Sequence, residues 1–260
     1  MTKVSCISPS YKTGKYLDGF LDSISEQTFR DFEVVLDHND PTKREIEQVE
    51  DHNEKEDNVT HIVVEGVDPI GVSMNRCIEH GTGDYFCIWN IDDLRTPDSL
   101  EVMVKALDDN PDVDFVYGNY VKVPQFRGTD GELVDETGKE EWLRIGMILG
   151  PFFMVRRSLL EKTGWFDEQL ISGADYDLAM RMARRGKGLH IPHILGYYLD
   201  EGLGQSTKPN SRQPLERTVI ELRYDIRVLD TKLVPQASSE YDLNKITFND
   251  TVIEASDFNE

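Results

Sequence analysis

Two adjacent aspartates, Asp92 and Asp93, close an otherwise apolar stretch, CIWNIDDLRTP at residues 87–97. Carboxylate oxygens are the hard ligands that Mg²⁺ and Mn²⁺ prefer, and proteins often hold such a cation with only one or two carboxylates. The pair therefore predicts a divalent cation site. The alternative is a turn that solvates the end of a strand, because aspartate favours turns without any ligand.

Strands and helices alternate in the chain that leads to this pair. Short apolar runs predict strands at KVSCISP (3–9), FEVVLD (32–37), VTHIVVEG (59–66) and DYFCIWNIDD (84–93). The spacing of Leu17, Phe20, Leu21 and Ile24 predicts a helix, and further helices are expected around Ile46 and Val49 and at SMNRCIEHG (73–81). This alternation predicts an α/β fold with a parallel, doubly wound sheet.

The expected sheet would gather several polar residues at one edge. In open α/β sheets, ligands bind in the crevice outside the carboxyl ends of the strands. That rule places Pro9 to Tyr11, Asp37 and Asn90 to Asp93 together. The sequence therefore predicts a ligand site at this edge.

The rest of the chain is less regular. Helices are expected at 99–111, 175–186 and 214–229, strands at 113–123 and 190–202, and a strand followed by a helix and a turn at 150–168. Residues 124–141 read as a mobile loop or a hairpin, and the acidic tail from Pro235 as a packing arm or a disordered end. We therefore expect one domain in two halves, 1–95 and 96–234, followed by an arm at 235–260.

Composition narrows the possible partners. The net charge of −21 argues against nonspecific binding to nucleic acid or to an anionic membrane, and a phosphate-rich ligand would need a metal or local positive dipoles. No apolar run is long enough for a membrane span or for the core of a signal peptide, so we expect a cytoplasmic protein. Cys6, Cys77 and Cys87 lack metal-site spacing and are interpreted as core residues.

Three stretches resemble, in the same order, the family-2 glycosyltransferases of the GT-A fold. They are SCISPSYKTGKYLDGFLDSISEQTFRDFEVV (5–35), GVSMNRCIEHGTGDYFCIWNIDDLRTPDSLE (71–101) and FFMVRRSLLEKTGWFDEQLISGADYDLAMRMARRG (152–186), and the resemblance covers residues 3–206. It implies a nucleotide-binding half joined to an acceptor-binding half. The implied activity is a metal-dependent, inverting transfer of sugar from a UDP- or GDP-sugar to a hydroxyl of a glycan, lipid-linked or protein-linked acceptor. The implied cofactor is Mn²⁺ or Mg²⁺.

The resemblance also implies roles for individual residues. It assigns base and ribose binding to Pro9, Ser10, Tyr11 and Asp37, further nucleotide contacts to Asn75 and Asn90, metal binding to Asp92 with Asp93, and acceptor deprotonation to Asp175. Simpler readings stay open for several of these residues. Tyr11 could pack on the first helix, Asn75 could be a helix cap or a buried amide, and Asp175 could be an N-cap, with Asp177 as the rival base.

Other candidate residues favour structural roles. His190 and His193 read as partly buried polar residues, and Arg156 and Arg157 as a structural pair at the start of a helix. No metal ligand is assigned to Asp200 or Glu201, where related enzymes often carry histidine.

Three departures from the family pattern keep a second class of function open. Asn90 and His38 stand where aspartate is usual, and Cys77 where glycine is usual. A degenerate domain that binds a nucleotide or a glycan without turnover would tolerate these changes. A nucleotidyltransferase fits less well, because SPSYKTGKY (8–16) is a poor match to the Gly-rich, basic loop of that class.

Overall fold

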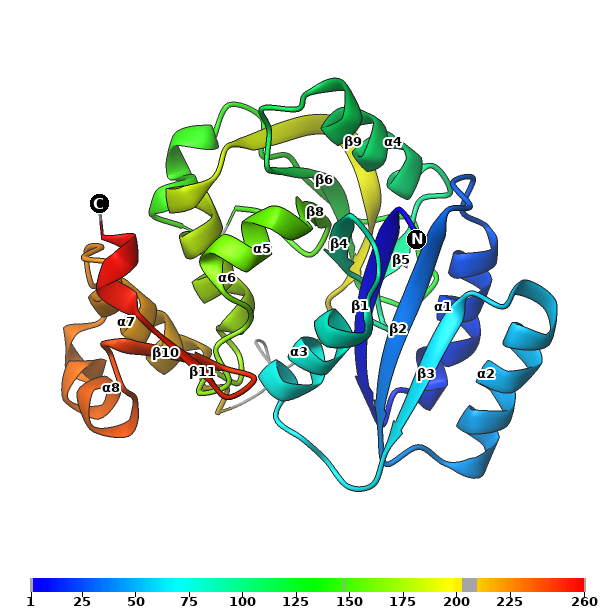
Figure 1. Ribbon diagram of the computed structural model, residues 1–260, viewed down its shortest axis with the longest axis horizontal. Helices are drawn as coiled ribbons and strands as arrows, with labels where there is room; N and C mark the ends of the chain where they lie inside the picture. The colour runs from blue at the N-terminus through cyan, green and yellow to red at the C-terminus, as the bar shows by residue number, and fades with distance from the viewer. Residues whose placement is uncertain (1, 147, 203–209, 260) are drawn as a thin grey trace.

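The computed structural model describes residues 2–146, 148–202 and 210–259. Its first half is a βα alternation, as the sequence predicts (Figure 1). The elements are β1 (Val4–Tyr11), α1 (Gly14–Ser25), β2 (Phe32–Asn39), α2 (Lys43–Glu56), β3 (Val59–Val64), α3 (Ile70–His80) and β4 (Tyr85–Ile88). These strands lie in the order β3-β2-β1-β4, and each neighbouring pair is parallel.

Helices cover both faces of this parallel sheet. The apolar face of α1, with Leu17 and Phe20, packs in one buried cluster with Val4 and Cys6 of β1. The opposite face of the sheet belongs to a second cluster, to which α3 contributes Met74, Cys77 and Ile78. Residues at i, i+3 and i+4 of a helix share one face, which is why the spacing in the sequence predicted α1.

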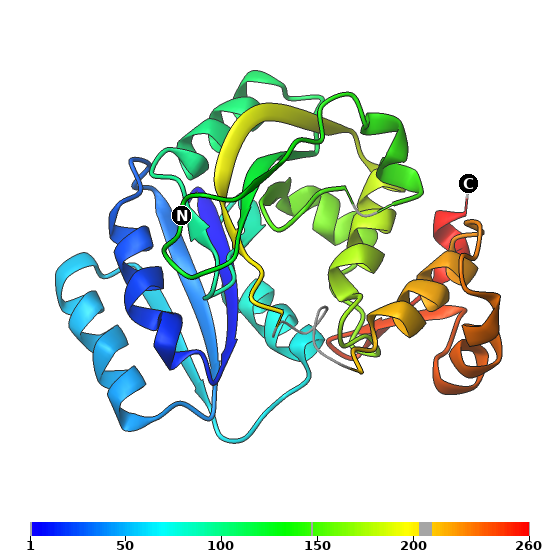
Figure 2. The same cartoon turned by 180° about the vertical axis from the view of Figure 1, so that it is seen from behind.

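The second half extends the sheet with mixed strand directions. Its elements are β5 (Leu94–Arg95), α4 (Ser99–Asp109), β6 (Phe115–Val123), β7 (Glu132–Val134), η1 (Glu140–Arg144), β8 (Phe153–Arg156), α5 (Arg157–Thr163), α6 (Ala174–Arg185) and β9 (Gly188–Leu199). The path continues from β4 through β8, β6 and β9 to β5. Figure 2 shows the long β9 curling this half around the helices α5 and α6.

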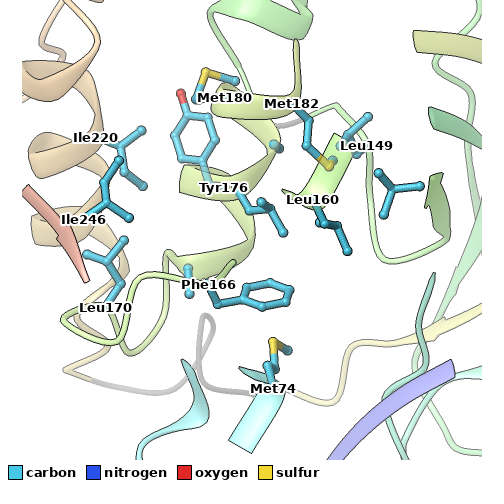
Figure 3. Packing of buried hydrophobic residues seen from close by; sticks show 14 of the residues in the cluster. Met74, Leu149, Leu160, Phe166, Leu170, Tyr176, Met180, Met182, Ile220 and Ile246 are labelled. Atoms are coloured by element: carbon cyan, nitrogen blue, oxygen red, sulfur yellow. The ribbon is translucent and has the colours of Figure 1, made fainter. Parts of the chain in front are cut away.

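Both uncertain segments of the sequence have defined structures. Residues 124–141 include β7, which pairs antiparallel with β6, so the hairpin alternative is correct. The C-terminal region contains α7 (Gln213–Arg223), η2 (Thr231–Leu233), α8 (Val234–Glu240), β10 (Lys245–Phe248), β11 (Thr251–Glu254) and η3 (Ala255–Phe258). We call residues 210–259 the C-terminal arm. Ile220 and Ile246 of the arm join the same apolar cluster as Met74 of α3 and Phe166 (Figure 3). Ile246 thus brings part of the tail 235–260 onto the core.

The strand that precedes the paired aspartates is shorter than its apolar pattern predicts. β4 ends at Ile88, and the backbone N–H of Asp93 donates to the carbonyl of Asn90 at 3.2 Å in a turn. Trp89 and Ile91 are buried, which explains why the turn reads as strand.

Two further expectations concern the core and the membrane. The three cysteines are buried free thiols, which confirms their interpretation as core residues. Within the described ranges no helix combines the length and the apolar character that a bilayer crossing requires. The cytoplasmic location stays a prediction. Residues 203–206, at the end of the region of family resemblance, lie outside the described residues.

Candidate active site

The two adjacent aspartates have different environments. Asp93 is 2% exposed, and its carboxylate accepts hydrogen bonds from the side-chain amide of Asn90 at 2.9 Å and from the backbone N–H of Leu199 at 3.1 Å. Burial, followed by the nearby charge of Asp92, raises the pKa of Asp93 to about 8. Asp93 therefore ties the turn after β4 to the end of β9. The side-chain amide of Asn90 is used within this turn, because it donates to the carboxylate of Asp93.

Asp92 is partly exposed, and its carboxylate has no side-chain partner among the described residues. Burial raises its pKa, and the charge of Glu201 adds to the shift. Glu201 is held beside the site by the hydroxyl of Tyr16 at 2.6 Å and by the Nζ atom of Lys15 at 3.1 Å. Asp92 is thus the carboxylate of the pair that is free to bind a cation.

The fit to a divalent cation rests on these donors. Among the described residues there is no cluster of three or more His, Cys, Asp or Glu side chains that could enclose a metal. Mg²⁺ and Mn²⁺ often take one or two carboxylates and complete their coordination with phosphate oxygens and water. A single free carboxylate beside a second acidic side chain fits that mode.

The end of β1 carries the residues expected at the base and ribose. Pro9 lies opposite Asp37 in the register of β1 and β2. Ser10 is buried, and its hydroxyl lies 2.5 Å from that of Thr13. Tyr11 is 40% exposed, so its ring is available to a ligand and does not serve as core packing.

Asp37 is buried and already bonded within the protein. The Nη1 atom of Arg76 lies 2.6 Å from one of its oxygens, and the side-chain amide of Asn39 lies 2.6 Å from the other. Arg76 also reaches the carboxylate of Asp68 at 2.5 Å. Arg76 and Asp68 are thus the partly exposed groups of this cluster, and the sequence pattern marks neither of them.

Asn75 is a buried amide that joins the two halves of the chain. Its Nδ2 atom donates to the carbonyl of Phe166 at 2.9 Å and to the carboxylate of Glu168 at 2.9 Å, and its Oδ1 atom accepts from the backbone N–H of Phe166 at 2.9 Å. These bonds hold the turn after α5 against α3. A role for Asn75 in nucleotide binding stays a prediction.

Asp175 lies in the first turn of α6. The helix begins at Ala174 with Gly173 as the N-cap, so Asp175 is not the capping residue. Its carboxylate accepts from the backbone N–H of Tyr176 at 2.8 Å. Burial raises its pKa, and the charge of Glu216 adds to this effect. A carboxylate with a raised pKa is suited to accept a proton near neutral pH.

A cavity of about 420 Å³ opens beside Asp175. It is lined by Ser172, Gly173, Asp175 and Tyr176 at the start of α6 and by Gln213, Pro214 and Arg217 of α7. The volume is within the range of small-molecule sites. No hydrogen bond or ion pair connects Asp175 with Asp92 in the described part of the chain, so their convergence on one substrate stays a prediction.

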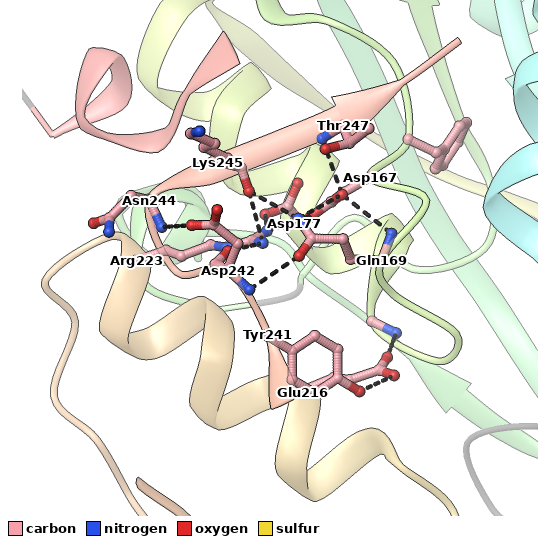
Figure 4. A network of polar contacts seen from close by, with 12 residues as sticks. Asp167, Gln169, Asp177, Glu216, Arg223, Tyr241, Asp242, Asn244, Lys245 and Thr247 are labelled. Carbon is pink, nitrogen blue, oxygen red and sulfur yellow. Dashed lines mark hydrogen bonds and ion pairs between the residues drawn. The ribbon is translucent and has the colours of Figure 1, made fainter. Parts of the chain in front are cut away.

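The rival base, Asp177, is part of a buried polar network (Figure 4). It is fully buried, and it accepts from Arg181 at 2.9 Å, from Arg223 at 3.1 Å and from the hydroxyl of Tyr224 at 2.7 Å. Burial opposes ionisation, but the two guanidinium groups prevail and hold the pKa of Asp177 below its usual range. Asp177 is therefore structural.

The remaining polar candidates also have structural partners. Arg156 donates to the carbonyls of Val113 and Leu107, and Arg157 donates to those of Gly81 and Gly83. The Nε2 atom of His190 lies 2.8 Å from the Oδ1 atom of Asn119, and that of His193 lies 3.1 Å from a carboxylate oxygen of Asp98. These contacts confirm the structural interpretation of both pairs.

Three residues near the candidate site have no role assigned from the sequence. Arg76, Glu201 and Glu216 each act through a partner far away in the chain: Asp37, Tyr16 and the segment 171–173. Glu201 alone carried a signal, because either it or Asp200 stands where related enzymes often carry a histidine. The other two are polar residues within helices and have no motif of their own.

Comparisons with known proteins identify the family. The model of glycosyl transferase family 2 matches residues 5–164. An uncharacterized glycosyltransferase of Methanocaldococcus jannaschii, MJ1057, is 26% identical over 189 residues, which are 68% of this chain and 63% of that protein. This chain thus spans less than two thirds of the length of that relative.

Solved structures share the fold. S. aureus TarS has a TM-score of 0.68 at 20% identity, with 94% of this chain and 71% of that chain covered. The mannosyltransferase PcManGT from Pyrobaculum calidifontis has a TM-score of 0.60 at 22% identity, with 85% and 62% covered. These likenesses confirm the expected GT-A fold. Because the family model matches more than half of the residues, the chain belongs to glycosyl transferase family 2.

Proposed function

We propose that the protein transfers a sugar from a nucleotide-diphosphate sugar to a hydroxyl of an acceptor, with inversion at the anomeric carbon and with Mn²⁺ or Mg²⁺ as cofactor. The observation that carries the proposal is the free carboxylate of Asp92 at the carboxyl edge of the parallel sheet, next to an Asp93 that is fixed by Asn90. Family membership supports transfer of a sugar.

The donor is proposed from the structural neighbours. TarS has been solved in complex with UDP-GlcNAc, with a TM-score of 0.67 to this chain, and PcManGT in complex with GDP-Man and Mn²⁺. We infer that this protein takes a UDP- or GDP-sugar. Tyr11 would contact the base, and Arg76, beside Asp37, would offer its guanidinium to the nucleoside.

The chemistry assigns separate tasks to Asp92 and Asp175. Asp92 would hold the divalent cation, which, when bound, offsets the negative charge on the leaving diphosphate. The acceptor would lie in the cavity beside Asp175. Its hydroxyl oxygen forms a bond to the anomeric carbon while the bond from that carbon to the diphosphate oxygen breaks, and the hydroxyl proton passes to the carboxylate of Asp175.

A panel of UDP- and GDP-sugars, each with and without manganese or magnesium, tests this function. We expect slow hydrolysis of one donor in the absence of acceptor, and we expect it to depend on the metal. Nucleotide affinity is measured in parallel by calorimetry. If no nucleotide sugar is bound or hydrolysed, the proposed function is wrong.

A second candidate is a domain that binds the nucleotide without turnover. Two observations favour it: the carboxylate of Asp37 is already bonded to Arg76 and Asn39, and the amide of Asn90 is directed to Asp93. The same panel separates the two candidates. Nucleotide binding without hydrolysis, and without transfer to any acceptor tried, would support the binding domain.

A further inference from the structure

A buried carboxylate from the C-terminal arm lies against the start of α6. Glu216 of α7 is fully buried, and its oxygens accept from the backbone N–H groups of Ile171 at 3.0 Å, Ser172 at 2.6 Å and Gly173 at 2.8 Å. The hydroxyl of Tyr241 donates to the same carboxylate at 2.9 Å (Figure 4). One side chain thus binds three successive amides.

These amides form the backbone that leads directly into α6. The helix begins at Ala174 and has no side-chain cap of its own from Gly173, and Asp175 is its second residue. The N-terminus of a helix carries unpaired N–H groups and a partial positive charge, which an anion stabilises. Glu216 supplies this anion from another helix, 43 residues away in the chain.

We propose that Glu216 is a positioning residue for Asp175, because it fixes the backbone from which the base reaches the acceptor. This inference rests on the proposed function. Ser172 and Gly173, which Glu216 binds, line the same cavity as Asp175, and so do Gln213 and Pro214, which precede Glu216 on α7. Glu216 therefore holds two walls of one cavity together.

The inference also gives the C-terminal arm a part in the activity. The match to the family model ends at Gly164, so α6 and the whole C-terminal arm lie beyond it. Tyr241, which follows α8, binds Glu216, and the Nε atom of Arg212 lies 3.7 Å from the carboxylate. Tyr241 and Arg212 of the arm thus fix the carboxylate of Glu216, which in turn positions Asp175.

The test compares two carboxylates that each serve the start of a helix. Glu216→Gln keeps the shape of the side chain but removes its charge and one acceptor oxygen. The matched control is Glu45→Gln: Glu45 lies in the capping box of α2 and accepts from the backbone N–H of Thr42 at 2.7 Å, in the other half of the molecule. For each variant we would measure kcat, the donor KM, nucleotide affinity and melting temperature.

We expect Glu216→Gln to lower kcat by about a hundredfold, as displacement of a catalytic group does, with donor KM and nucleotide affinity unchanged. Glu45→Gln should lower the melting temperature without this loss of kcat.

In an Asp175→Asn background, Glu216→Gln should reduce the residual rate no further, because its effect passes through Asp175. If Glu216→Gln fails to fold, Tyr241→Phe replaces it and should lower kcat by about tenfold.

The outcomes separate this inference from the function on which it rests. An active wild-type protein whose Glu216→Gln variant keeps its kcat, or loses activity equally with and without Asp175, overturns the positioning role alone. If Tyr241→Phe is used instead, an unchanged kcat also overturns the positioning role of Glu216. A wild-type protein that neither hydrolyses nor transfers any nucleotide sugar overturns the proposed function and this inference with it.

Discussion

Asp92 and Asp93 are neighbours in the chain with unlike partners. Asp93 binds Asn90 and the backbone of Leu199, whereas the carboxylate of Asp92 has no such bonds among the described residues. Burial raises the pKa of both carboxyl groups, and the charge of Asp92 adds to the shift of Asp93. Only Asp92 can change partners without loss of a bond that supports the fold.

The first prediction concerns the metal. Asp92→Asn should reduce manganese-dependent nucleotide binding by at least about tenfold, because the amide lacks the negative charge that a hard cation prefers. Calorimetry with UDP or GDP, with and without Mn²⁺, measures the effect. Asp98→Asn, a change at a partly exposed carboxylate at the start of α4, is the control and should bind as wild type. Unaltered metal-dependent binding by Asp92→Asn would disprove the assigned role.

The second prediction separates Asp175 from Asp177. Asp175→Asn should retain nucleotide binding and lose transfer by about a hundredfold or more, because an amide cannot accept the acceptor proton. Asp177→Asn should instead destabilise the fold by about 3 kcal/mol, since it leaves the buried Arg181 and Arg223 without their shared charge. Steady-state kinetics and chemical denaturation measure the two effects. Transfer at the wild-type rate by Asp175→Asn would exclude it as the base.

At the scale of elements, α3 connects the two halves. Asn75 exchanges two hydrogen bonds with the backbone of Phe166, and a Cβ atom added at Gly71 would lie 3.1 Å from the Cα of Glu168. The turn that follows α5 thus lies directly on the first turn of α3. The turn leads to the segment 171–173 and then to Asp175, so this contact sets where α6 begins relative to the parallel sheet.

A third prediction tests this contact. Asn75→Ala leaves the buried backbone N–H and carbonyl of Phe166 unpaired and should lower the free energy of unfolding by about 2 kcal/mol or more. Urea denaturation measures the change. Asn53→Ala, which removes side-chain bonds to the backbone of Val59 at the partly buried end of α2, serves as a comparison and should cost less. If Asn53→Ala lowers the free energy of unfolding as much as Asn75→Ala or more, the contact between α3 and Phe166 has no particular weight in stability.

The edge pair β2 and β3 predicts a dependence of stability on pH. The Nδ1 atom of His38 lies 3.1 Å from the Nε2 atom of His61. Burial, then the charge of His38, lowers the pKa of His61 to about 4, and burial also lowers the pKa of His38. Between the ordinary pKa of about 6.5 and these lowered values, these two histidines bind more protons in the unfolded chain than in the folded protein.

The fourth prediction follows from that sign. The contribution of His61 to stability should fall by about 1 kcal/mol as the pH is lowered from about 7 towards 4, after allowance for its partial exposure. His61→Gln lacks this contribution, so the melting temperature of wild type relative to His61→Gln should fall over the same range. Parallel curves for the two proteins would mean that His61 is not the group responsible.

At the scale of the whole molecule, the C-terminal arm contributes to the buried polar network and to the apolar core. Arg223 of α7 is buried between Asp167 and Asp177, and its Nη2 atom donates to the carbonyls of Asp242 at 2.8 Å and Lys245 at 3.0 Å. The arm also places Tyr241 and Ile246 in the main apolar cluster. Because this cluster includes residues from β1 to η3, all three expected segments contribute side chains to it.

The fifth prediction tests that dependence. Removal of residues 235–260 should lower the free energy of unfolding by at least about 3 kcal/mol. Arg223 loses two acceptors, and the apolar cluster loses Tyr241 and Ile246. Circular dichroism during thermal unfolding measures the loss. Val252→Ser, at a residue 53% exposed on β11, should have little effect. A truncated chain as stable as the full one would show that residues 235–260 add nothing to the stability of the core.

The parts of the fold that follow from the sequence are those set by near neighbours in the chain. The spacing of Leu17, Phe20 and Ile24 predicted α1, because residues on one helix face are three or four positions apart. Periodicity did not find where β4 ends, since buried Trp89 and Ile91 continue the apolar pattern into the turn. Periodicity also could not distinguish a hairpin from a loop at 124–141. The pairing of β7 with β6 depends on both segments together, whereas a periodic pattern describes one segment at a time.

By itself the sequence determined the α/β alternation, the carboxylates at the end of a strand and the motifs that match glycosyl transferase family 2. The tertiary structure alone decided which aspartate is free, that Asp37 is bonded to Arg76, and that Glu216 binds the start of α6. The reason is physical. A periodic pattern reports which face of an element is buried, whereas the partner of a buried polar group depends on distant elements that packing brings together.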